Sequence, residues 1–67
     1  MKAHEARVML EQGDLALKIE KLKKFLGSGA ADTVRSEELI LLQVQLLVMT
    51  AYSQILSERI KLFTGED

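Results

Sequence analysis

The side chains best suited to binding an anionic ligand lie near the two ends of this chain of 67 residues. The stretch HEAR supplies an imidazole at His4 and a guanidinium at Arg7, and the stretch YSQILSER supplies Tyr52, Ser53 and Arg59. A guanidinium can donate two parallel hydrogen bonds to a phosphate, and a tyrosine ring offers a face for stacking an aromatic base. These residue types together predict a site for a small nucleotide.

Two of these residues belong to a polar series that repeats every seven positions: Glu38, Gln45, Tyr52 and Arg59. On a helix this series lies between two apolar stripes, so packing on either side would partly bury it. Buried polar groups need hydrogen-bond partners. The series therefore either contacts a ligand, which adds Gln45 to the candidate site, or fixes the register of a helical bundle. The residues leave both interpretations open.

The sequence contains few of the residue patterns that enzymes use for catalysis. It contains no nucleophile beside a base, no glycine-rich phosphate loop and no metal-ligand spacing, and Glu37-Glu38 is typical of the charge at a helix start. With no cysteine, disulfide and zinc scaffolds are excluded. Nine Lys/Arg against ten Asp/Glu give a net charge of −1, which argues against DNA or RNA as a partner. We expect a protein without catalytic activity, metal or cofactor.

The candidate residues must be positioned by helices. Proline is absent, and two of the four glycines fall in the stretch GSGAADT, which predicts one connector. We expect a single domain with a helix at about 3–26, a linker at 27–35 and a second helix at about 36–63. Gly27 should take a left-handed cap, and the Ser36 hydroxyl should cap the second helix.

Folding the chain at this connector sets neighbours across the hairpin. Residues whose numbers sum to about 61 should lie side by side, given ~1.5 Å of rise per residue in both helices. His4 would then lie level with Ser57, and Arg7 with Gln54. The open end of the hairpin would gather the candidate site.

Heptad spacing predicts which helical faces are buried. In the first helix the seam is Met1, Val8, Leu15 and Leu22, completed by Ile19 and Leu26. In the second helix it is Leu39, Leu42, Leu46, Met49, Ser53, Leu56, Ile60 and Phe63.

Further apolar residues lie outside these seams. They are Leu10 and Leu17 on the first helix and the series Leu41, Val48, Ile55 and Leu62 on the second. A chain this short buries only ~60% of its unfolded surface, and one helical partner cannot cover two stripes. The predicted fold is all-α: a two-helix antiparallel hairpin that assembles into an oligomeric helical bundle, as a homodimer or homotetramer.

The apolar run Leu39–Leu56 is 18 residues long, close to the minimum for a membrane span. Its three glutamines, with Thr50 and Ser53, would be costly in lipid, and no aromatic belt follows it. Charged residues interrupt the N-terminal stretch, unlike the apolar centre of a signal peptide. We expect no membrane association and a cytoplasmic location.

The spacing of HEARV (4–8), KIEKL (18–22), Gln45, Tyr52-Ser53 and Arg59-Ile60 resembles that of small helical-hairpin proteins encoded by phages and prophages. Some such proteins are anti-CBASS sponges, which blind host immunity by binding nucleotide signals. The resemblance implies that a cyclic dinucleotide or related nucleotide is held, without cleavage, in pockets between protomers in the host cytoplasm. By position, the implied ligand residues are His4, Arg7, Gln45, Tyr52, Ser53 and Arg59. Gly13-Asp14 departs from the pattern.

A second hypothesis assigns the protein to another class. A small oligomerising adaptor could bind a host or phage protein through the stripe of Leu41, Val48, Ile55 and Leu62. Self-assembly would consume this stripe, whereas an adaptor would leave it free.

Overall fold

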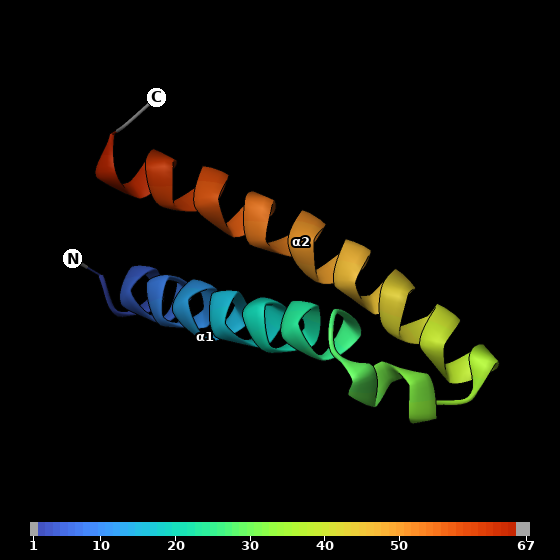
Figure 1. The fold of residues 1–67 in the computed structure, drawn as a ribbon. Helices are drawn as coiled ribbons and strands as arrows, with labels where there is room; N and C mark the ends of the chain where they lie inside the picture. Colours follow the sequence, from blue (N-terminus) through green and yellow to red (C-terminus); the bar gives the residue numbers. More distant parts are fainter. Residues whose placement is uncertain (1, 66–67) are drawn as a thin grey trace.

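Two antiparallel α-helices and a short connecting helix make up the fold (Figure 1). The structure is a computed structural model and describes residues 2–65. Helix α1 spans Ala3–Leu26, the 3₁₀-helix η1 spans Gly29–Thr33, and α2 spans Ser36–Thr64. No strand occurs within the described range, so the predicted all-α hairpin is confirmed. Assembly of hairpins into a bundle stays a prediction.

The end of α1 differs from the expected left-handed cap. Gly27 has φ −89° and ψ 0°, a right-handed conformation, and its N–H donates to the Lys23 carbonyl at 3.0 Å. No left-handed residue is needed here, because the Ser28 side chain bonds to the end of α1 and to the start of η1. Its hydroxyl donates to the Phe25 carbonyl at 2.8 Å and accepts from the Ala30 N–H at 3.3 Å, which starts η1. The prediction for Gly27 was wrong.

The start of α2 also differs from the expected cap. Arg35 is the capping residue and makes no capping side-chain bond, whereas Ser36 is already helical. The first helical bond runs from the Leu39 N–H to the Arg35 carbonyl at 2.9 Å, so the capping residue lies one position before the predicted Ser36. At the other end, Gly65 has φ 75° and supplies a left-handed cap that the sequence analysis did not identify.

The two predicted seams form the core. Val8, Leu15 and Ile19 of α1 are buried against Leu56 of α2, which has no exposed surface. Four partly buried residues of the α2 seam pack on this cluster: Leu46, Met49, Ile60 and Phe63. The prediction that these faces meet is confirmed. Met1 of the predicted α1 seam lies outside the described residues.

The register between the helices is offset from the predicted one. The His4 ring lies 6.1 Å from the Phe63 ring, edge to face, whereas the prediction paired His4 with Ser57. The helical turn of η1 explains the offset, because it carries the chain past the end of α1 before α2 begins (Figure 1). The contacts of His4, Glu11 and Gln12 therefore all lie further along α2 than predicted.

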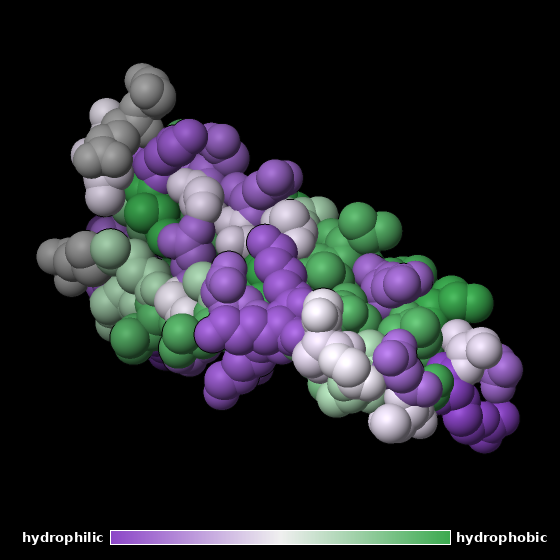
Figure 2. Space-filling model, in the orientation of Figure 1, coloured by the Kyte–Doolittle hydropathy of each residue, from purple (hydrophilic) through white to green (hydrophobic). Residues whose placement is uncertain are grey.

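Much apolar surface remains on the outside of the hairpin. Figure 2 shows hydrophobic side chains, in green, on the half of α2 next to the connector. Leu41, Val48, Ile55 and Leu62 are 58–77% exposed, and Leu10 and Leu17 of α1 are also exposed. By length and composition alone, α2 could cross a membrane. The predicted second stripe of α2, Leu41, Val48, Ile55 and Leu62, is thus exposed to solvent in a single chain.

Replacing Gly13 by alanine is expected to raise the free energy of unfolding by about 1 kcal/mol, because glycine costs that much in a helix interior. A Cβ at Gly13 would meet no atom within 4 Å. Urea denaturation followed by circular dichroism measures the change. A loss of stability would mean that another molecule packs closely against α1 at this position.

Candidate functional site

A groove between the two helices contains two of the predicted ligand residues, Arg7 and Tyr52. Its volume is about 330 Å³, and it is open to solvent. Six of the lining residues come from α1 and one from α2: Arg7, Leu10, Glu11, Asp14, Leu15, Lys18 and Tyr52.

The α1 wall of this groove follows from helical spacing. Residues 7, 11, 14 and 18 are three or four positions apart and therefore share one face. Arg7 and Lys18 place a cation toward each end of this face, and the carboxylates of Glu11 and Asp14 lie between them. Asp14 and Lys18 were outside the predicted site, although their spacing from Arg7 and Glu11 indicates that they share this face.

Tyr52 reaches the groove from α2. Its hydroxyl donates a hydrogen bond to the Glu11 carboxylate, which joins the helices across the groove. The tyrosine is 39% exposed, so part of the ring surface is available for stacking. Within residues 2–65, the two ion pairs join Arg35 to Glu37 and Lys61 to Glu58. Neither involves Arg7, so its guanidinium can bind an anion.

Arg59 lines a different groove, on the outer side of α2. This second groove has a volume of about 670 Å³ and is lined by α2 residues alone: Ala51, Gln54, Ile55, Glu58, Arg59 and Leu62. The structure does not bring Arg59 into the groove of Arg7 and Tyr52. The hypothesis that both arginines line one pocket of a single chain is not supported by this geometry.

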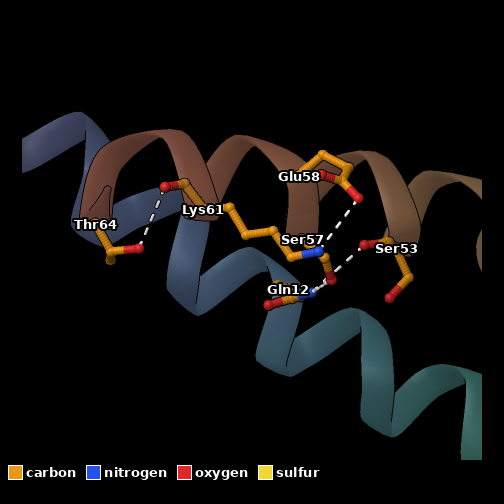
Figure 3. Close-up of polar contacts among 6 residues, drawn as sticks. All are labelled: Gln12, Ser53, Ser57, Glu58, Lys61 and Thr64. Atoms are coloured by element: carbon orange, nitrogen blue, oxygen red, sulfur yellow. Dashed lines mark hydrogen bonds and ion pairs between the residues drawn. The ribbon is translucent and has the colours of Figure 1, made fainter. Parts of the chain in front are cut away.

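Ser53 belongs to a polar contact inside the helix pair (Figure 3). The Gln12 side-chain amide donates to the Ser53 carbonyl at 3.4 Å and also to the Ser57 hydroxyl. Gln12 occupies a seam position between Val8 and Leu15, where it satisfies polar groups between the helices. Ser53 takes part through its backbone carbonyl, and Gln12 is a polar seam residue that was outside the prediction.

The other two predicted residues lie apart from the groove. His4 packs edge-on against Phe63. Gln45 is exposed, and its amide donates to the Met49 sulfur at 3.8 Å. Of the six predicted ligand residues, a single chain therefore gathers Arg7 and Tyr52 in one groove.

The groove offers a guanidinium that can bind an anion, a tyrosine ring that can stack, and two carboxylates that can accept hydrogen bonds. Ligand pockets commonly have volumes of about 300–1,000 Å³, so the groove is at the small end of this range. Among residues 2–65, no three metal-ligating side chains of the His, Cys, Asp and Glu types gather in one place.

Comparison with known proteins gives two matches. The family model described as Sequestin matches residues 2–62. A protein of Enterobacteria phage T4, described as "Uncharacterized 7.5 kDa protein in denB-rIIB intergenic region", is 43% identical over 63 residues. The aligned region covers 94% of this chain and 98% of the phage protein. No solved structure is significantly similar to the chain.

Proposed function

The chain belongs to the Sequestin family, and from this premise we propose that it is a phage-encoded protein that sequesters a nucleotide signal of host immunity. The family name is consistent with sequestration. The signal we propose is a cyclic dinucleotide or a related nucleotide, held without cleavage in the host cytoplasm. Such binding would deny the signal to its CBASS-type receptor.

The observation that carries this proposal is the shared groove of Arg7 and Tyr52. Arg7 would bind a phosphate, because its guanidinium makes no ion pair within residues 2–65. Tyr52 would stack against a base, with its hydroxyl anchored by Glu11. Asp14 and the second oxygen of Glu11 could accept hydrogen bonds from an exocyclic amine of the base.

The groove of one chain is too small to enclose a dinucleotide, so the proposed pocket lies between protomers of a homo-oligomer. In such a pocket a polar residue of another protomer, such as Gln45, would supply contacts that one chain lacks. This arrangement would explain why the six predicted ligand residues are separated within a single hairpin.

The exposed outer stripe of α2 favours a second candidate function. A stripe that is 58–77% exposed could bind a helix of a host or phage protein, as an adaptor does. This candidate needs no role for the groove of Arg7 and Tyr52. Ligand binding therefore distinguishes the two functions.

The test is a thermal-shift screen of the purified protein against cyclic dinucleotides and other signalling nucleotides, with inorganic phosphate as a control. A ligand at 100 times its Kd stabilises the folded state by about 2.7 kcal/mol, which raises the melting temperature measurably. A nucleotide that raises it while phosphate does not would support the proposal. A flat screen at millimolar ligand would contradict it.

Replacing Arg7 by alanine is expected to weaken binding of the nucleotide by about 10- to 100-fold, through loss of a charge-assisted hydrogen bond. Replacing Tyr52 by leucine should also weaken it, because stacking is lost while apolar contact is kept. Isothermal titration calorimetry measures both changes. The matched control is Lys24→Ala, an exposed cation at the other end of α1. Equal effects of Arg7→Ala and Lys24→Ala would mean that net charge, and no specific site, attracts the ligand.

A further inference from the structure

The polar series of α2 is complementary to itself when one copy is reversed. In chain order it reads acid, amide, phenol and base: Glu38, Gln45, Tyr52 and Arg59, all exposed and seven positions apart. An antiparallel second copy places each Glu38 beside the Arg59 of the other and each Gln45 beside the other Tyr52. We infer that the outer face of α2 binds a second copy of this chain in this antiparallel arrangement, with the two-fold axis beside Val48.

The apolar residues next to the series fit the same axis. They are spaced alternately by three and four positions, as in a helix pair that packs knobs into holes. All of them are exposed in the single chain: Leu41, Val44, Val48, Ala51 and Ile55. Reversing one copy about Val48 sets Leu41 opposite Ile55 of the other copy, so leucine, valine and isoleucine fill the centre of the interface.

The distribution of charge favours the antiparallel orientation over the parallel one. No charged residue occurs between positions 39 and 57, so charges flank the apolar centre. Glu37 and Glu38 lie at the start of α2, and Arg59 and Lys61 lie near its end. A parallel pair would set like charges together at both ends and align the helix dipoles, which is unfavourable.

The hairpin exposes more surface than a compact monomer of its mass, as expected for a chain that binds a partner. The chain has 5167 Å² of accessible surface, whereas a compact monomer of 7.5 kDa has about 4,200 Å². The excess of about 1,000 Å² is close to the area of about 800 Å² that each partner buries in a standard interface. One α2–α2 contact along the stripe would therefore account for the surplus.

A bilayer is a poorer occupant of this face. Helix α1 packs along the opposite face of α2 and carries Glu11, Asp14 and Lys18, which would have to enter the lipid with it. Charged side chains are costly at membrane depth. A second hairpin accepts the apolar stripe and leaves the charges of α1 in water.

The arrangement also completes the candidate groove, and in this respect it rests on the proposed function. Tyr52 lines the groove, so the Gln45 amide of the second copy would reach the groove edge beside Tyr52. An amide can both donate to and accept from a base edge. Arg59 is assigned to the interface, where it pairs with Glu38 of the other copy, which leaves Arg7 as the phosphate ligand.

Single-cysteine cross-linking tests the orientation, because the natural chain contains no cysteine. Val48→Cys should form a covalent dimer under mild oxidation or with a short bismaleimide. Leu41→Cys alone should not, since an antiparallel pair holds its two thiols about 20 Å apart along the axis. A mixture of Leu41→Cys and Ile55→Cys should cross-link. Efficient cross-linking of Leu41→Cys to itself would overturn the proposal in favour of a parallel pair.

Charge exchange tests the pairing of the series. Glu38→Arg or Arg59→Glu alone places like charges together at both ends of the interface, and we expect either to raise the dimer Kd by about tenfold or more. The double variant should restore the natural Kd, measured by sedimentation equilibrium. Glu20→Arg on α1 is the control and should leave it unchanged. Additive weakening in the double variant would overturn the pairing.

These experiments contain no nucleotide, so they can fail independently of the proposed function. A monomer that binds nucleotide would overturn the interface and leave sequestration standing. A cross-linked antiparallel dimer without nucleotide binding would support the interface and contradict sequestration. Flotation of the protein with phosphatidylcholine vesicles would show that lipid covers the stripe and would overturn the second-copy assignment.

Discussion

Replacing Leu56 by alanine is expected to lower the free energy of unfolding by about 2–5 kcal/mol. Leu56 is fully buried, and it packs against Val8, Leu15 and Ile19 of α1. The substitution removes apolar contacts and leaves a cavity that two rigid helices can fill only in part. A domain of this size has little stability to spare, so much of the population should unfold at room temperature.

Urea titration with circular dichroism at 222 nm measures this effect. The matched control is Leu17→Ala, which makes the same change at a leucine that is 62% exposed on α1. The control should change the stability far less. Similar losses in the two variants would show that the packing of Leu56 is not what holds the hairpin together.

The second large effect is expected when Val48 and Ile55 are both replaced by glutamate. They are 62% and 58% exposed in the single chain, and assembly would bury them. Each unpaired charge at a buried position costs several kcal/mol, and a two-fold interface contains each substitution twice. We expect the oligomer to dissociate, with loss of helix content where the hairpin cannot persist alone.

Light scattering and circular dichroism measure the mass and the helicity of this variant. The control is Gln43→Glu with Thr50→Glu, which adds the same charge at the same seven-residue spacing on exposed α2 positions outside the stripe. The control should keep the natural mass. An unchanged mass in the Val48 and Ile55 variant, with helicity kept, would show that the interface lies elsewhere.

The sequence predicted the core because periodicity determines which faces of two helices can be buried. The 3-4 spacing through Leu46, Met49 and Leu56 identified the α2 face that meets α1, and the series through Val8 and Leu15 identified its counterpart. The buried face of each helix can be predicted from this spacing without knowing the conformation of the connector. The same reasoning identified the second stripe, which the structure leaves exposed.

The register could not be predicted, because it depends on the local bonding of the connector. The Ser28 hydroxyl bonds to Phe25 and Ala30 and so converts a predicted loop into the turn of η1. This turn moves the contacts of His4 from Ser57 to Phe63. Glycine composition indicates where a chain bends but not how many residues the bend takes up.

Two of the predicted ligand residues share a groove, and their role in binding stays a prediction. Chemistry and heptad position identified Arg7 and Tyr52, which line one groove. The bond from Tyr52 to Glu11 was outside the prediction, because it depends on the offset register. Residues of a site shared between protomers, such as Gln45 in the proposed dimer, cannot be placed from the geometry of one chain.

The most direct test of the proposed sequestration is a depletion and recovery measurement. The protein is incubated with a cyclic dinucleotide, the unbound nucleotide is collected by ultrafiltration, and the retained fraction is heated to denature the protein. Chromatography then measures the nucleotide in both fractions. We predict that the filtrate is depleted and that the missing nucleotide is recovered intact after heating. Undiminished nucleotide in the filtrate, across the nucleotides that phage hosts use as immune signals, would contradict sequestration, and recovery of a cleaved product would show an enzyme instead.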